Sequence, residues 1–236
     1  MNFLIVFAHP SKTSFNASLK DKAISVLTEA GHNVMVSDLY KMKFKAAADQ
    51  DDFVDGVDMD NFNYLREQYK ASQNGTFAQD IVLEQEKISW ADYIIFQYPM
   101  WWTETPAILK GWFDRVLAYG FAYGPGVYEK GNLRGKKALL SFTTGGKDLT
   151  NFGPNSIKGE MSERLFNIQH EKLYFVGLDI VEPFIVPSGV DLVSRENFME
   201  QYKSYLLNIE NAPLVSYRPS SDYINGKLKE EVTQTN

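Results

Sequence analysis

Continuous apolar runs recur along the chain and are separated by more polar stretches. Asn2–Ala8 is a continuous apolar run rich in β-branched and aromatic residues, and similar runs follow at Tyr93–Tyr98 and Lys137–Thr143. Such runs are typical of strands buried on both faces of a sheet. Val34–Leu39 and Asp179–Val186 predict two further strands.

Helical periodicity fills most of the intervals between these runs. Ser14 is a good N-cap, and apolar residues follow it at helical spacing until Gly31. Three more helices are predicted over Ile81–Ala91, from Pro106 to about Ala118, and over Ser194–Ile209.

Strands that alternate with helices predict an α/β fold with a doubly wound, five-stranded parallel sheet. We expect the flavodoxin-like strand order 2-1-3-4-5, with the fifth strand at an edge because Pro183 has no N–H donor. The ligand crevice of such a sheet lies beyond the carboxyl ends of the central strands. Three predicted loops meet there: Ala8–Asn16, Pro99–Thr105 and Thr143–Gly159.

Two segments lack clear periodicity. Lys41–Asp80 is polar and holds six aspartates between Asp49 and Asp60, which predicts a long solvated loop. A loop of this length inside a compact domain usually has a function, so packing against a second subunit is an alternative. The C-terminal residues predict an arm or a disordered tail, and we divide the chain into a domain over residues 1–212 and an arm over residues 213–236.

Composition narrows the class of protein. The formal net charge is −6 and basic residues form no block, which disfavours nucleic acid and anionic membranes as partners. The chain has no cysteine, so disulfides, thiolate catalysis and cysteine metal sites are excluded, and we predict no metal site. The first residues do not resemble a signal peptide, and apolar runs fall short of the roughly 18 residues that cross a bilayer. We therefore expect a cytoplasmic protein without an integral membrane segment.

The first loop, AHPSKTSFNAS, combines a helix N-terminus with short hydroxyl side chains, which attract phosphate. His9 lies at a strand's carboxyl end and is a candidate phosphate or ribityl contact. Ser14 is a further candidate, although it can equally serve only as the helix cap. The chain lacks both the GxGxxG and the GxxxxGK[ST] patterns at this position, which disfavours a dinucleotide fingerprint and a P-loop.

The second loop places aromatic surface at the crevice. Pro99, Met100, Trp101, Trp102 and Thr103 directly follow the third strand. Adjacent indoles and backbone amides suit a flat heterocycle, which gains apolar burial and stacking. The alternative is that an indole is part of the core, as we expect for Trp112.

The third loop opens with Thr143, Thr144, Gly145 and Gly146. Two glycines after a strand allow the backbone to approach a ligand closely, and their N–H groups could bond the pyrimidine edge of a flavin. Donors at that edge stabilise the negative charge of a reduced flavin. A simple glycine turn is the alternative.

With these motifs the sequence resembles the NAD(P)H:quinone oxidoreductases of the DT-diaphorase type and their bacterial relatives of the modulator-of-drug-activity kind. The resemblance runs from about residue 2 to residue 187. It rests on these segments: HPSKTSFNASL, SDLY, NFNY, DIVLEQEKI, ADYIIFQYPMWW, PAILKGWFDRVL, GFAYG and ALLSFTTGG.

The resemblance implies a homodimer with non-covalent FAD. Hydride would pass from NADH or NADPH to the flavin and then to a quinone or similar flat acceptor, in a ping-pong cycle. His9, Phe15 and Asn16 match flavin phosphate and ribityl contacts. Asn63 matches a residue that reaches the adenine half from the partner subunit, and Tyr123 matches a partner-supplied wall of the substrate pocket. The residues expected to face the reacting rings are Trp102, Gly145, Gly146 and Tyr123.

Departures from the family pattern leave alternatives open. Animal members carry a Tyr and a His after TTGG, where this chain has Asn151 or Phe152 and Lys158. Pro125 stands where a second wall tyrosine is expected. FMN is an alternative to FAD. An ancillary subunit of a potassium-efflux transporter and a flavodoxin-type one-electron carrier are alternative functions.

Overall fold

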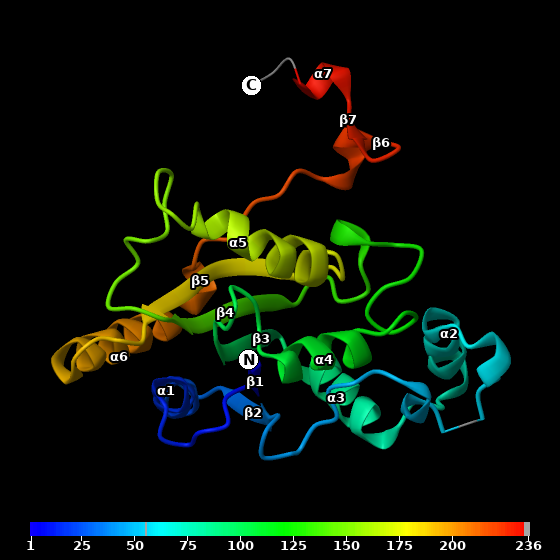
Figure 1. Ribbon diagram of the computed structural model, residues 1–236, viewed down its shortest axis with the longest axis horizontal. Helices are drawn as coiled ribbons and strands as arrows, with labels where there is room; N and C mark the ends of the chain where they lie inside the picture. Colours follow the sequence, from blue (N-terminus) through cyan, green and yellow to red (C-terminus); the bar gives the residue numbers. More distant parts are fainter. Residues whose placement is uncertain (55, 234–236) are drawn as a thin grey trace.

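The computed structural model describes residues 1–54 and 56–233. Five parallel strands form the central sheet, and they are β1 (Asn2–Phe7), β2 (Asn33–Asp38), β3 (Tyr93–Pro99), β4 (Lys137–Thr144) and β5 (Asp179–Pro187). Their order is β2-β1-β3-β4-β5, which confirms the predicted flavodoxin-like fold (Figure 1). Near the carboxyl edge of the sheet the register is regular, and Gln97 on β3 pairs with Phe7 on β1 and with Ser141 on β4.

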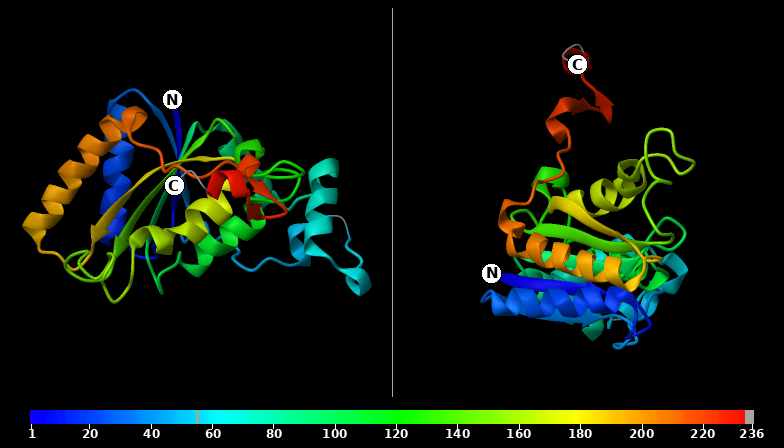
Figure 2. Two further views of the ribbon diagram at one scale, coloured as in Figure 1. Left: turned by 90° about the horizontal axis from the view of Figure 1, so that it is seen from above. Right: turned by 90° about the vertical axis from the view of Figure 1, so that its left-hand side faces the viewer.

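Helices cover both faces of the sheet (Figure 2). Along β1, Phe3 and Ile5 face α1 (Phe15–Glu29) and α6 (Leu192–Leu207). Leu4 and Val6 point the other way, toward α3 (Gln79–Trp90), α4 (Ala107–Val116) and α5 (Met161–Ile168). Alternate residues of β1 therefore pack into two separate cores, which explains why β1 is apolar from Phe3 to Phe7.

Two prolines mark boundaries of elements. Pro106 is the N-cap of α4 rather than its first helical residue, one position from the prediction. Pro183 lies on the edge strand β5, as predicted, at an irregularity where the register with β4 shifts between Leu139 and Ser141. On the outer side of β5, Leu214 forms an isolated antiparallel bridge with Val181, so the start of the C-terminal segment covers part of this edge.

The prediction of an irregular solvated loop over Lys41–Asp80 is wrong in part. This segment contains α2 (Tyr64–Asn74) and two short 3₁₀ helices, Gln50–Asp52 and Met59–Asn61. The α2 sequence is largely polar, and capping residues at both ends define where this helix begins and stops. Asn63 caps it by accepting from the Arg66 N–H at 2.9 Å, and Gly75 ends it with φ of 69°.

The aspartates of this segment are not all solvated. Asp52 has no exposed surface and pairs with the buried guanidinium of Arg115, with 2.9 Å between Arg115 Nε and Asp52 Oδ1. Asp55 lies outside the described residues.

The secondary structure of two further segments was not predicted from the sequence. α5 continues into a π-helical segment, Gln169–Tyr174, between β4 and β5. After Pro213 the chain projects beyond the sheet and forms a small antiparallel pair, β6 (Tyr223–Ile224) and β7 (Lys227–Leu228), followed by α7 (Glu230–Thr233) (Figures 1 and 2). In residues 1–54 and 56–233, every helix is too short or too polar to span a bilayer.

Candidate flavin site at the carboxyl edge of the sheet

The three predicted loops converge at the carboxyl edge of the sheet. The Met100 N–H donates to the Thr143 carbonyl at 2.7 Å, which joins the second loop to the third. Asn16 Nδ2 donates to Thr143 Oγ1 at 2.8 Å, which joins the first loop to the third. Asn16 is 3% exposed, so this bond is made in the core, at the floor of the site.

His9 is held as a neutral side chain at the entrance to the first loop. The Ser11 N–H donates to its Nδ1 at 3.0 Å, which favours the neutral ring with the proton on Nε2, and the same Nδ1 lies 3.2 Å from the Ser11 carbonyl. Burial lowers the pKa of His9, and the contact between Nδ1 and the Ser11 carbonyl offsets this only in part. Ser14 does serve as the cap of α1, since its Oγ accepts from the Ala17 N–H at 3.1 Å. Nε2–H and the first turn of α1 thus remain as donors for an anion.

The second loop is a tight turn in which Trp101 and Glu104 exchange two backbone hydrogen bonds of 3.0 Å. Trp102 and Thr103 occupy the left-handed region, with φ of 53° and 60°. Trp102 is 98% exposed and Trp101 is 42% exposed, whereas Trp112 is fully buried in the core, as predicted. A bulky residue at positive φ is strained, and such strain concentrates at functional sites.

The third loop offers an uncovered backbone. A Cβ built on Gly145 meets nothing within 4 Å, so this stretch faces open space. Thr144 Oγ1 is buried and has no hydrogen-bond partner among the described residues. An unpaired buried hydroxyl beside an open backbone is the signature expected of a ligand-binding edge.

The sequence did not identify the loop that follows β5 as part of the site. The Gly189 N–H donates to the Gly146 carbonyl at 2.7 Å, and a Cβ on Gly189 would lie 2.6 Å from that oxygen. Gly146 itself has φ of 99°. Only glycine at position 189 allows the two loops to touch, and a lone glycine after an edge strand gives no signal of this contact.

Arg195 on α6 was also missed. Its guanidinium lies 5.2 Å from the Phe15 ring centroid and donates to the Ser188 carbonyl at 3.1 Å. Its Nε is buried without a partner in the described part of the chain. A cation with a free donor therefore lies beside the first loop, where phosphate is expected. An arginine in a polar helix gives no such indication in the sequence.

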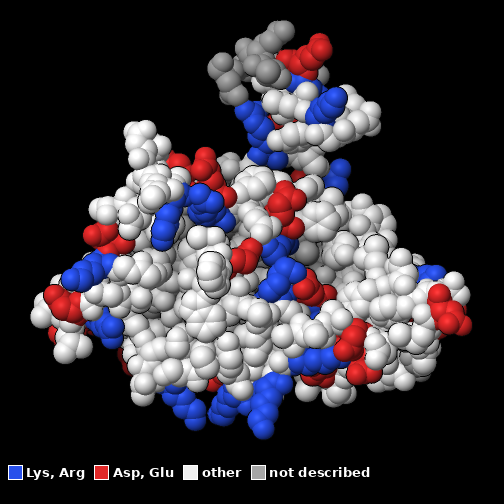
Figure 3. All heavy atoms as spheres, in the orientation of Figure 1, with Lys and Arg blue, Asp and Glu red and all other residues white. Residues whose placement is uncertain are grey.

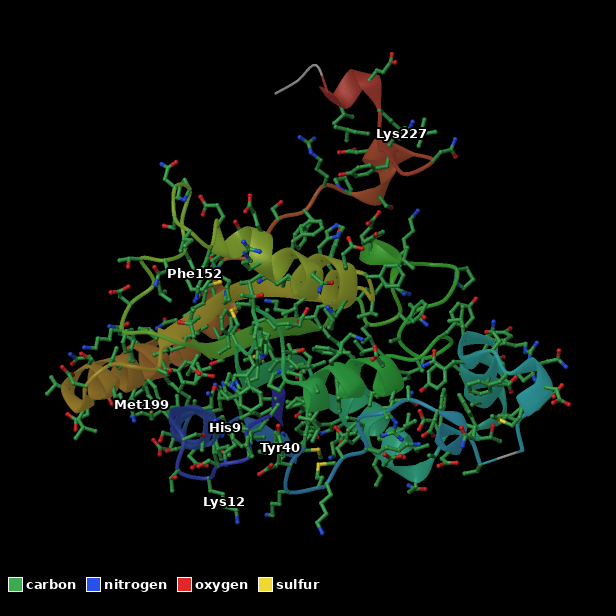
Figure 4. All side chains as sticks on the ribbon, in the orientation of Figure 1. His9, Lys12, Tyr40, Phe152, Met199 and Lys227 are labelled. Carbon is green, nitrogen blue, oxygen red and sulfur yellow. The ribbon has the colours of Figure 1, made fainter. Side chains whose placement is uncertain are left out.

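The outer part of the third loop is a separate compact turn. Lys158 Nζ lies 4.9 Å from the Phe152 ring centroid, and the Lys158 N–H donates to the Asn151 carbonyl at 3.2 Å. Figure 4 shows Phe152 on the outer stretch of this loop. Lys158 is exposed and its cation is occupied by the Phe152 ring.

A hollow of about 230 Å³ lies on the other side of the first loop, lined by His9, Lys12, Tyr40 and Lys41 among others. His9, Lys12 and Tyr40 lie close together at the lower edge of the molecule (Figure 4). Figure 3 shows lysine and arginine side chains protruding along the same edge. The hollow therefore brings Lys12 and Lys41 beside the carboxylate of Asp38, the last residue of β2.

Two predicted site residues lie away from the three loops. Asn63 caps α2, and Tyr123 follows α4. Tyr123 lines a groove of about 450 Å³ with Leu65, Gln68 and Leu117. Burial raises the pKa of Tyr123, so its phenol stays protonated. The chain thus presents two surfaces, the three-loop site and this α2–α4 groove.

Comparison with known proteins places this arrangement in a class. A family described as flavodoxin-like fold matches residues 1–209. The chain is 39% identical to the NAD(P)H dehydrogenase (quinone) 1 of Cavia porcellus, over 92% of this chain and 80% of the relative. It is 43% identical to the human ribosyldihydronicotinamide dehydrogenase (quinone), over 77% of this chain and 79% of the relative.

Solved structures of similar fold give the same family. A Klebsiella pneumoniae protein described as a quinone reductase superposes with a TM-score of 0.94 at 36% identity, covering 98% of this chain and 95% of that one. The NAD(P)H:quinone oxidoreductase of Methanothermobacter marburgensis gives a TM-score of 0.68 at 30% identity, covering 89% and 97%. The fold and site define a flavodoxin-like protein. Within that class, the chain belongs to the NAD(P)H:quinone oxidoreductase family.

Proposed function

We propose that this protein is an NAD(P)H dehydrogenase (quinone), which passes a hydride from NADH or NADPH through bound FAD to a quinone or similar flat acceptor in a ping-pong cycle. The observation that supports this most directly is the convergence of the three loops, joined through Thr143. Relatives that share 39% and 43% identity and carry the corresponding dehydrogenase names support the reaction class.

The residues at this edge fit a flavin. The open backbone at Gly145 and the unpaired Thr144 hydroxyl suit the polar rim of an isoalloxazine, while Trp101 offers apolar surface on the adjoining loop. When bound, the flavin supplies reversible hydride chemistry. The protein's part is to hold the ring, orient donors toward its pyrimidine edge, and limit water at the reacting face.

The phosphate end of the cofactor has its own set of donors. His9 Nε2–H, the first-turn amides of α1 and the free Arg195 Nε would bind the pyrophosphate of FAD. Neutral His9 donates without adding charge, and Arg195 adds a cation that matches the anion. We therefore prefer FAD over FMN, which needs fewer such contacts.

The site becomes complete in a homodimer. Tyr123 lines the α2–α4 groove, and Asn63 caps α2 next to the groove residue Tyr64. Neither belongs to the three loops, and we propose that each reaches the site of a partner subunit. Exposed Trp102 would then pack against a second chain, with Tyr123 and Pro125 as the opposite wall of the acceptor pocket. Lys158 would be the cationic substitute for the missing family Tyr and His, once freed from Phe152. We further expect a cytoplasmic location.

The test is to purify the protein, release its chromophore by heat and identify it by mass. Turnover of menadione is then measured with NADH and with NADPH. We expect FAD, parallel-line kinetics and activity of the purified protein alone. Recovery of FMN would change the cofactor only. A stable semiquinone on half-reduction without menadione turnover would indicate a one-electron carrier, and turnover that requires a membrane partner would indicate an ancillary subunit. A colourless protein that binds neither flavin would contradict the proposal.

A further inference from the structure

A buried chain of polar side chains runs through the core to the floor of the proposed site. Ser141, Gln97, Asn16 and Thr143 are each at most 4% exposed. Ser141 Oγ donates to Gln97 Oε1 at 2.8 Å, and Gln97 Nε2 donates to Asn16 Oδ1 at 2.9 Å. Asn16 Nδ2 in turn donates to Thr143 Oγ1 at 2.8 Å. Gln97 and Ser141 are paired neighbours on the same face of the sheet as Ile95 and Leu139, which precede them by two residues and are apolar.

Every bond in this chain points the same way, toward Thr143. Because Thr143 Oγ1 accepts from Asn16, its hydroxyl proton remains free to donate to a group in the proposed site. If the side-chain amides of Gln97 and Asn16 were both flipped, each hydrogen bond would have the opposite direction. Thr143 would then donate its hydroxyl proton to Asn16. The direction therefore decides whether the site is offered a donor or only an acceptor.

Tyr202 on α6 packs on the same side of the sheet as this chain of side chains. It is fully buried, burial raises the pKa of its phenol, and its hydroxyl has no hydrogen-bond partner among the described residues. The Ser141 hydroxyl donates to Gln97, and this bond is the inner end of the chain.

We propose that Ser141, Gln97 and Asn16 form a relay that fixes the Thr143 hydroxyl as a hydrogen-bond donor to the bound flavin, with Gln97 as a positioning residue. This inference rests on the proposed flavin function. A donor oriented before the reaction costs no reorganisation when negative charge develops on the ring. Thr144 is the contrast, since its hydroxyl has no described partner to fix its direction.

The experiment is a double-mutant cycle on the flavin-loaded protein. Thr143→Val should raise the flavin dissociation constant about tenfold and lower the flavin midpoint potential, whereas Thr143→Ser should stay within about twofold of the parent. Gln97→Met should move both quantities in the same direction as Thr143→Val. Added to Thr143→Val, it should change the dissociation constant less than about twofold, because it acts through the hydroxyl that is already absent.

Controls separate this role from a general loss of packing. Gln85 is another buried glutamine, whose Nε2 donates to the Val116 carbonyl at 3.2 Å on the opposite face of the sheet. Gln85→Met should leave flavin affinity and midpoint potential unchanged. If Gln97→Met does not fold, Ser141→Ala replaces it in the cycle with the same expected direction. Additive effects of Gln97→Met and Thr143→Val, or wild-type flavin properties in both single variants, would overturn the relay. Failure of the parent protein itself to bind flavin would instead reject the proposed function.

Discussion

At the scale of single residues, the site is built from conformations and contacts that a folded chain usually avoids. Trp102 and Thr103 lie at positive φ, each at a cost on the order of 1 kcal/mol or more. The paired backbone bonds of the turn offset part of this cost, and Asn167 Nδ2 holds the base of the turn by donating to Glu104 Oε2 at 2.7 Å. The strained turn presents the Trp102 indole to solvent, where it buries almost no apolar surface. This exposure supports the proposal that a ligand or a second chain covers it.

Gly145 provides a test of the ligand-binding edge. Its backbone tolerates a side chain, because its φ is not positive and a Cβ would enter open space. Gly145→Val should therefore leave the thermal unfolding midpoint of the apoprotein within about 2 °C of the parent. The branched side chain would occupy the space where the flavin rim is expected, so flavin content after purification should fall at least about tenfold. Absorbance at the flavin band, relative to protein, measures this.

Gly153→Val is the matched control for that substitution. Gly153 lies on the outer part of the same loop, its φ is not positive, and its nearest neighbour would be Ser156 Oγ at 3.5 Å. It should retain normal flavin content. If both valine variants lose flavin equally, the effect belongs to the loop as a whole and not to the edge at Gly145.

At the scale of elements, the strands and their order followed from the sequence, whereas the helices α2, α5 and α7 did not. A strand such as β3 is buried over its whole length, and its mostly apolar sequence indicates that burial directly. α2 carries few apolar residues, and its stability comes from a cap at Asn63 and from contacts with distant residues. Sequence periodicity cannot report contacts of that kind. The three loops were located from the strand ends that they follow, whereas Gly189 and Arg195 join the site through contacts with the distant residues Gly146 and Phe15, which periodicity cannot report.

The segment that carries α2 is fastened by buried charge. Asp52 accepts from Arg115 Nε at 2.9 Å, from the Tyr64 hydroxyl at 2.6 Å and from Lys45 Nζ at 3.1 Å. Arg115 also makes a two-point contact with Asp80, at 2.6 and 3.1 Å. These donors satisfy both carboxylate oxygens of Asp52, so its buried charge is paired. The network therefore stabilises the attachment of the α2 segment to the rest of the chain.

Tyr64→Phe should loosen this attachment without removing a charge. Loss of one hydrogen bond to a buried carboxylate is worth about 1.5–3 kcal/mol, and we expect the unfolding midpoint of the apoprotein to fall by roughly 3–10 °C. Tyr69→Phe is the control, because Tyr69 lies on the same helix and is 48% exposed. Its midpoint should stay within about 1 °C of the parent. Equal shifts in the two variants would show that Asp52 is not the anchor.

At the scale of the whole molecule, two separate surfaces of the chain expose apolar side chains. The three-loop site exposes Trp102, and the α2–α4 groove exposes Leu65 beside Tyr123. An isologous dimer would pair such surfaces twice, so that each of two identical sites received residues from both chains. In the proposed dimer, this is the reason why Asn63 and Tyr123 lie apart from the three loops within one chain.

Leu65→Glu tests the dimer, because Leu65 is 50% exposed on α2 and both residues are good helix formers. A carboxylate at the proposed interface should shift the mass measured by light scattering from two chains to one. Since the acceptor pocket would then lose the partner's wall, kcat/KM for menadione should fall at least about tenfold, equivalent to about 1.4 kcal/mol. Leu83→Glu is the control, on α3 and 46% exposed but outside the groove, and it should remain a fully active dimer. A Leu65→Glu protein that is monomeric yet fully active would show that one chain holds a complete site, and a dimeric one would place the interface elsewhere.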